Sequence, residues 1–200
     1  LGFWQRDALS DVCADVVNLN RDYVRLRLVK SDEELGWFRI GASLCDVAID
    51  ALTDHLRSGL DEHDLGDIVE RSYTPWGART VIHFFGVTSM HDPQLEVPAQ
   101  FTSRRRVDKG DVVFTEISAT FGEYSGQVLR TYAVEEDPTT LYKDLHDAAQ
   151  AAYEAIKAAA RPGARPEDLI EASGVIEDAG FTTCDDLVHG YGGGYFPPIV

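Results

Sequence analysis

Two stretches of the chain carry the same residues in one ungapped register 104 positions apart, since 152 − 48 and 169 − 65 both equal 104. Each stretch reads as a long amphipathic helix, a glycine and then a short helix that begins with an acidic residue. Such a repeat indicates an internal duplication of about half the chain. The alternative is that two amphipathic helix pairs look alike through composition alone. The matched positions are Ala48, Ala51, Arg57, Gly59, Asp64 and Leu65, which recur as Ala152, Ala155, Arg161, Gly163, Asp168 and Leu169.

Hydrophobic periodicity predicts the elements of the first half. Residues 23–30, YVRLRLVK, alternate with period two and predict a strand. Ser31 and Glu34 form an S-x-x-E capping box, so a helix is expected to begin there and to run to about Leu56. Its apolar stripe is expected to consist of Leu35, Phe38, Ala42, Cys45, Ile49 and Leu52. The elements expected to follow are a helix over 65–71 and a strand over 79–88.

The second half is expected to open with a β-hairpin. Residues 112–120 and 127–134 are rich in β-branched and aromatic residues and are joined by a turn that contains glycine. An alanine-rich helix is predicted over 139–160, and Pro162-Gly163 should end it. A further helix is predicted over 166–179, ending at Gly180.

Charge and cysteine content exclude several classes of function. The chain has 18 Lys and Arg against 34 Asp and Glu, a net charge of −16, which repels nucleic acids and anionic membrane surfaces. No apolar run approaches the ~20 residues of a membrane span. The N-terminus has no signal-peptide pattern. The three cysteines form no CxxC pair and suit a reducing compartment. These features predict a cytoplasmic protein.

Several short motifs resemble the M24 peptidase family, whose members include methionine aminopeptidase, aminopeptidase P, prolidase and creatinase. The motifs that carry the resemblance are Lys30-Ser31, Lys109-Gly110-Asp111, Arg130-Thr131, Arg161-Pro162-Gly163 and His189-Gly190-x-Gly192. The resemblance implies an α+β pita-bread fold with an internal duplication, in which helices cover a curved antiparallel sheet. It also implies a homodimer.

The same resemblance divides the chain into two parts. Residues 1–29 would be the end of a preceding N-terminal segment or a linker. Residues 30–200 would form the pita-bread domain of catalytic type, with half-repeats of about 30–108 and 134–200. Whether the C-terminal strands of the fold are missing is left open.

The resemblance also shows where metal ligands are expected. The family's peptidases hold two divalent ions, and the hairpin supplies two aspartates eleven residues apart. Here these positions are Glu116 and Gln127, since 127 − 116 is 11. An amide oxygen is a weak ligand and cannot bridge two cations as a carboxylate does. The family's first histidine ligand falls on His189, but its second falls on Phe196, and its substrate-handling histidine falls on Ala99. The family's two glutamate ligands would lie beyond Val200.

These departures predict no metal site, with Mn or Co held by Glu116 and His189 as the alternative. His189, Glu116 and His91 are then the candidate catalytic residues, because imidazole and carboxyl groups can move protons near neutral pH. The candidate substrate-binding residues are Gln127, Tyr191, Tyr195 and Phe196.

Three functions remain open at this point. The first is a metal-independent hydrolase or lyase that acts on a C–N or related bond of a small amino-acid-like substrate. The second is a metallo-aminopeptidase or Xaa-Pro dipeptidase with a variant metal site. The third is a catalytically inactive module that binds a peptide. The expected partner is a small-molecule or dipeptide-like substrate rather than a nucleic acid or a membrane.

Overall fold

The computed structural model describes residues 3–10, 12–13, 15–191 and 195–200. Side chains at positions 3, 10, 191 and 195–198 lie outside this description. The chain divides into two compact units, residues 1–30 and residues 31–200. The first unit contains α1 (Phe3–Ser10) and α2 (Asn20–Leu28). Among the described residues, none of the helices has both the length and the apolar character needed to cross a bilayer.

Helix α2 replaces the strand predicted over 23–30, so that prediction was wrong. A strand needs a partner strand to form hydrogen bonds with its backbone N–H and C=O groups, whereas a helix forms these hydrogen bonds within itself. Asp22 lies in the first turn and Arg25 and Arg27 lie in the last turn, which complements the helix dipole. Lys30 Nζ then donates to the carbonyl oxygen of Arg27 at 2.5 Å at the end of the helix. The charges at the two ends of this segment therefore favour a helix, although its apolar residues alternate with period two.

Helix α3 (Asp32–His55) begins at the predicted capping box. The amide of Glu34 donates to Ser31 Oγ at 3.2 Å, and the amide of Ser31 donates to Glu34 Oε2 at 2.8 Å. The buried face of the helix differs in part from the predicted stripe, because α3 approaches the sheet through its small residues. The buried residues of α3 are Gly41, Leu44, Cys45, Ala48 and Leu52.

Helix α4 (Glu62–Tyr73) is longer than the predicted 65–71. Asp61 caps it by accepting hydrogen bonds from the amides of His63 and Asp64. A short 3₁₀ turn, η1 (Thr74–Trp76), leads into β1 (Arg79–Ser89), which confirms the predicted strand.

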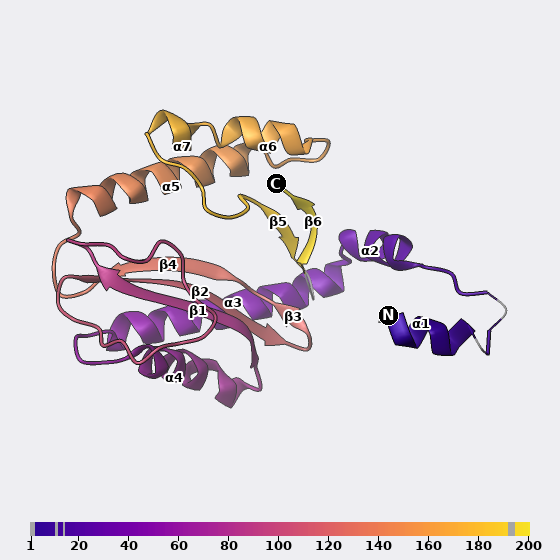
Figure 1. Cartoon of the computed structure of the whole chain (residues 1–200), viewed down its shortest axis with the longest axis horizontal. Coiled ribbons are helices and arrows are strands. Elements are labelled where there is room, and N and C mark those ends of the chain that lie inside the picture. Colours follow the sequence, from indigo (N-terminus) through magenta and orange to yellow (C-terminus); the bar gives the residue numbers. More distant parts are fainter. Residues whose placement is uncertain (1–2, 11, 14, 192–194) are drawn as a thin grey trace. The chain divides into compact units, whose positions relative to one another are not determined.

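The predicted hairpin is present and extends the sheet. Its strands are β2 (Asp111–Phe121), β3 (Tyr124–Ser125) and β4 (Val128–Ala133). Strand β2 pairs antiparallel with β1, β3 and β4. Helices α3 and α4 lie on one side of this sheet (Figure 1). The core between helices and sheet includes Leu52, Leu65, Val69, Phe85, Val113 and Ile117.

The alternation of side chains along β2 places Glu116 on the face away from α3 and α4. Val113 and Ile117 belong to the core against these helices. Successive side chains of a strand point to opposite faces, so Glu116 points away from that core. Glu116 pairs with Phe84 of β1 and with Leu129 of β4, near the middle of the sheet.

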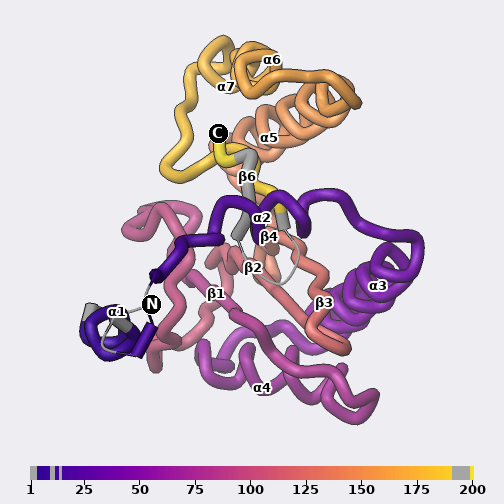
Figure 2. The backbone as a smooth tube through the Cα atoms, turned by 90° about the vertical axis from the view of Figure 1, so that its right-hand side faces the viewer, coloured from indigo at the N-terminus to yellow at the C-terminus, as the bar shows by residue number. Residues whose placement is uncertain are grey.

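The C-terminal part contains α5 (Thr140–Ala159), α6 (Pro166–Ala172), α7 (Val175–Asp178), β5 (His189–Tyr191) and β6 (Tyr195–Ile199). The single helix predicted over 166–179 was wrong, because Ser173 and Gly174 separate α6 from α7 and Ser173 Oγ donates to the carbonyl oxygen of Ile170. Both views show α5, α6 and α7 on the other side of the sheet from α3 and α4 (Figures 1 and 2). The internal duplication and its half-repeats stay a prediction.

Candidate active site

The two positions expected from the hairpin face each other directly. Glu116 lies on β2, and Gln127 immediately precedes β4. Gln127 Nε2 donates to Glu116 Oε1 at 2.6 Å. A short hydrogen bond of this kind holds the carboxylate in one orientation. The hairpin therefore fixes a carboxyl group and an amide as one polar pair.

Burial controls the protonation of Glu116. The side chain is partly buried, and the loss of solvent raises the pKa of its carboxyl group above the ordinary value. The hydrogen bond from Gln127 and the charge of His189 lower the pKa, while the charges of Asp185 and Asp186 raise it. Burial is the largest of these effects. Glu116 therefore keeps its proton to a higher pH than an exposed glutamate does.

His189 opens β5 and is half-buried. Its Nδ1 lies 3.1 Å from the carbonyl oxygen of Gly190. A carbonyl oxygen can only accept, so Nδ1 carries the proton of this hydrogen bond, and in the neutral ring Nε2 carries the lone pair. His189 also lies close enough to Glu116 for its charge to lower the pKa of that carboxyl group. The structure thus brings Glu116, Gln127 and His189 together.

Two acidic residues near this site were not predicted from the sequence. Asp185 and Asp186 lie just before β5, and their charges raise the pKa of Glu116. The stretch CDDLVH does place two carboxylates within four residues of His189. This spacing could have indicated that the two carboxylates lie near His189, because residues just before a short strand lie at the end where the strand begins.

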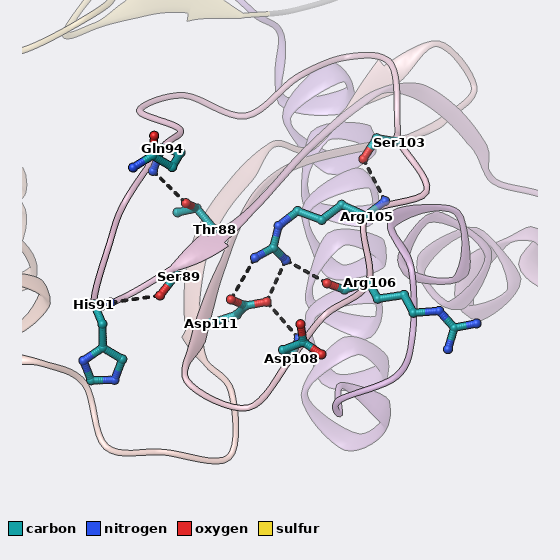
Figure 3. A network of polar contacts seen from close by, with 9 residues as sticks. All are labelled: Thr88, Ser89, His91, Gln94, Ser103, Arg105, Arg106, Asp108 and Asp111. Carbon is teal, nitrogen blue, oxygen red and sulfur yellow. Dashed lines mark hydrogen bonds and ion pairs between the residues drawn. The ribbon is translucent and has the colours of Figure 1, made fainter.

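His91 lies elsewhere. Its Nε2 is 2.8 Å from Glu136 Oε1, and both side chains are exposed. Figure 3 shows its imidazole directed away from the pair formed by Arg105 and Asp111. In the register of β1 with β2, Ser89 pairs with Asp111 whereas Phe84 pairs with Glu116, a separation of roughly 16 Å at ~3.3 Å per residue. The structure does not bring His91 to Glu116.

Ala99 holds the position at which the resemblance places the family's substrate-handling histidine. Ala99 forms two backbone hydrogen bonds with Phe85, of 3.1 and 2.8 Å, at the outer edge of β1. Phe85 pairs in turn with Thr115, the neighbour of Glu116. The backbone thus places Ala99 beside β1, and Ala99 offers no polar side chain there.

Three aromatic residues are expected to line the site. The side chains of Tyr191, Tyr195 and Phe196 lie outside the described residues, as do positions 192–194. Their backbones show that Tyr191 pairs with Tyr195 and that Gly190 pairs with Phe196. Their role in substrate binding stays a prediction.

Glu116, Gln127 and His189 alone do not fit a pair of divalent ions. They offer one carboxyl group with a raised pKa, one amide and one imidazole, and the amide presents its N–H to the carboxylate, while the carboxylates of Asp185 and Asp186 lie near enough for their charges to act on Glu116. Bridging two hard cations needs anionic oxygens. Within the described part of the chain, no three His, Cys, Asp or Glu side chains form a group that could hold a metal ion.

Comparisons with known proteins agree on one family. The sequence model of metallopeptidase family M24 matches residues 37–196. The chain is 25% identical over 170 residues to the Xaa-Pro dipeptidase of Pyrococcus furiosus, covering 84% of this chain and 47% of the relative. The chain therefore spans about half the length of the curated relatives that it matches.

Solved structures show the same fold. The X-Pro aminopeptidase from Thermotoga maritima superposes with a TM-score of 0.85 at 19% identity, covering 100% of this chain and 57% of that one. The dipeptidase PepE from Mycobacterium ulcerans gives a TM-score of 0.76 at 24% identity, covering 90% of this chain and 48% of that one. This likeness confirms the α+β pita-bread fold expected from the sequence.

Proposed function

The chain belongs to metallopeptidase family M24, and we propose that it is a hydrolase that cleaves an amide C–N bond of a small, dipeptide-like substrate. The relatives named as dipeptidases and aminopeptidases support this class of reaction. The observation that carries the proposal is the hydrogen-bonded pair of Glu116 and Gln127 on the sheet face away from α3 and α4, with His189 of β5 near enough for its charge to act on Glu116.

The side chains of Glu116, Gln127 and His189 favour acid–base catalysis by the protein's own residues. His189 Nε2 would accept a proton from a water molecule, whose oxygen then forms a bond to the amide carbon. Glu116, whose pKa burial raises, would in its protonated form give its proton to the leaving nitrogen as the C–N bond breaks. The proton taken by His189 then returns to Glu116. Gln127 would position the acid through its 2.6 Å hydrogen bond.

A second candidate is a metal-dependent dipeptidase in which Mn or Co is bound by Glu116 and His189. The observation that favours it is the proximity of these two side chains, since His189 lowers the pKa of Glu116 through its charge. The description of the family as metallopeptidases also fits such a cofactor.

The two candidates differ in a direct assay. The full chain would be incubated with Xaa-Pro and other dipeptides, and free amino acids would be measured with and without EDTA. The first candidate predicts turnover that EDTA leaves unchanged and that Glu116→Gln and His189→Ala each reduce by about 10²-fold or more. Glu96→Gln, which changes an exposed loop residue, is the matched control and should keep full activity.

Loss of turnover in EDTA with recovery on adding Mn²⁺ or Co²⁺ would select the second candidate instead. Absence of turnover for dipeptides and simple amides alike would contradict the proposed function as a whole. A cytoplasmic location and a homodimer complete the proposal, and light scattering of the purified chain would test the dimer.

A further inference from the structure

A cleft of about 480 Å³ lies between α4 and the outer edge of β1. It is separate from the candidate active site. Glu116 is opposite Phe84 in the sheet, and the neighbouring residues His83 and Phe85 point to the other face. His83 and Phe85 line the cleft. Its volume is that of a site for a small molecule.

A directed series of hydrogen bonds runs from the protein interior to this cleft. The amide of Ser118 donates to His83 Nδ1 at 3.3 Å, so in the neutral ring the proton lies on Nε2. His83 Nε2 then donates to Tyr73 Oη at 2.7 Å. Tyr73 donates to Thr80 Oγ1 at 2.5 Å, and Thr80 donates to Glu70 Oε1 at 2.9 Å. Each donor is satisfied in turn, and the series ends on a carboxylate.

Burial favours the neutral forms of the interior members, His83 and Tyr73. Burial lowers the pKa of His83, and it raises the pKa of Tyr73 to about 12. The charge of the series is therefore concentrated on Glu70, at the rim of the cleft. Because Thr80 binds one of its oxygens, the carboxylate is oriented before any ligand arrives.

Other acceptors gather at the same cleft. His63, Asp67 and Glu70 lie one helical turn apart on one face of α4. Both oxygens of Asp67 accept from Arg71, at 2.8 and 2.6 Å, on an exposed surface, and each oxygen keeps a further lone pair that can accept from a ligand. Gln100 and Thr102 also line the cleft, and Thr102 Oγ1 lies 3.0 Å from His63 Nδ1.

The rest of the lining is apolar. Val81, Ile82 and Phe85 form a wall beside these acceptors. A hydrated metal ion gains nothing from such a wall, and the described residues contain no group of three metal-ligating side chains. A ligand with an alkyl chain and a positively charged hydrogen-bond donor at its end would pack against the apolar wall and donate to the carboxylates.

We propose that this α4–β1 cleft is a second binding site, which takes a small organic cation with a primary ammonium group. The ammonium donates to Glu70, with Asp67 and the side-chain oxygens of Gln100 and Thr102 as further acceptors. The alkyl part packs against Val81 and Phe85. This inference does not depend on the proposed hydrolase activity.

The test is calorimetric titration of the full chain with 1,4-diaminobutane. We expect saturable binding of one molecule per chain. Glu70→Gln keeps the shape of the acceptor and removes its charge, so it should weaken binding about tenfold or more. Glu171→Gln removes the same charge from an exposed position on α6 and should leave the affinity unchanged. The neutral isostere 1,4-butanediol should not bind.

A second measurement locates the ligand. In NMR spectra of the chain, 1,4-diaminobutane should shift the amide signals of α4 and β1, and Glu116→Gln should not change its affinity. The proposal would be overturned by absence of saturable binding, by equal affinity in Glu70→Gln, by equal binding of the diol, or by loss of binding in Glu116→Gln. Circular dichroism of each variant separates loss of binding from loss of fold.

Discussion

Gln127 donates from its side-chain amide to the carboxyl group of Glu116 at 2.6 Å, on the sheet face away from α3 and α4. Two opposing effects meet at this contact. The hydrogen bond favours the ionised carboxylate, whereas burial favours the neutral acid, and burial has the larger effect. Glu116 therefore keeps its proton to a higher pH than an exposed glutamate does.

The raised pKa of Glu116 predicts a pH-dependent stability. The contribution of its neutral form is complete below the pKa of the unfolded chain and is lost as the pH rises through the higher pKa of the folded chain. Glu116→Gln mimics the neutral acid at every pH. The gain in unfolding free energy of this variant over the wild type should therefore grow as the pH rises through this window. Urea unfolding from acidic to neutral pH measures it.

The control for this prediction is Glu96→Gln, in an exposed loop. Its difference from the wild type should stay flat over the same pH range. A flat difference for Glu116→Gln as well would mean that burial does not disfavour the charge of Glu116.

The approach of α3 to β3 predicts opposite effects for two glycines of one helix. A Cβ at Gly41 would lie 2.7 Å from the backbone nitrogen of Gly126 and 2.7 Å from the carbonyl oxygen of Tyr124, while a Cβ at Gly36 would meet nothing within 4 Å. Gly41→Ala should therefore destabilise the chain by about 2 kcal/mol, because backbone atoms cannot move aside cheaply. Gly36→Ala should stabilise it by about 0.5–1 kcal/mol through helix propensity. Thermal unfolding measures both, and equal effects would contradict the close approach.

Local signals explain which elements could be predicted. The capping box of Ser31 and Glu34 and the aromatic strand β1 follow from residues that are adjacent in sequence. The segment over 23–30 could not be read correctly, because an alternating pattern identifies a strand only when a partner strand exists, and that partner is a tertiary feature. The break at Gly174 between α6 and α7 was missed for a related reason, since a helix of composition like this one often continues through a single glycine.

The candidate site was predictable where its residues occupy motif positions. Glu116, Gln127 and His189 follow from the family resemblance, and the structure brings them together. The series that joins His83 to Glu70 was not predicted, because its members come from α4 and β1 and meet only through the packing of helix on sheet. No spacing in the sequence indicates that contact.

The hydroxyl group of Tyr73 should be worth a measurable part of the stability. Its side chain is fully buried and joins His83 to Thr80. Tyr73→Phe leaves the Nε2–H of His83 without its partner, which should cost about 1–3 kcal/mol. Tyr153→Phe removes a hydroxyl group from a side chain that is 59% exposed, and it should cost far less. Chemical denaturation of the two variants makes the comparison, and equal costs would show that the interior hydrogen bonds add nothing.

The last prediction concerns the ion pair between Arg105 and the buried carboxylate of Asp111 at the start of β2. The carboxylate of Asp111, with 4% of its side chain exposed, accepts from Arg105 at 2.7 and 2.9 Å and from the amide of Asp108 at 2.8 Å (Figure 3). Arg105→Ala leaves this charge without a counter-ion and should cost about 3 kcal/mol of unfolding free energy. Arg104→Ala, at an exposed position of the same loop, should cost little.

A double variant identifies the origin of that cost. If the penalty comes from the unpaired buried charge, adding Asp111→Asn to Arg105→Ala should recover part of the lost stability, because the amide carries no charge and still accepts from the amide of Asp108. If the guanidinium group instead contributes through packing, the second substitution should add its own cost. Urea unfolding of the four proteins of this cycle separates the two cases by the sign of the coupling energy.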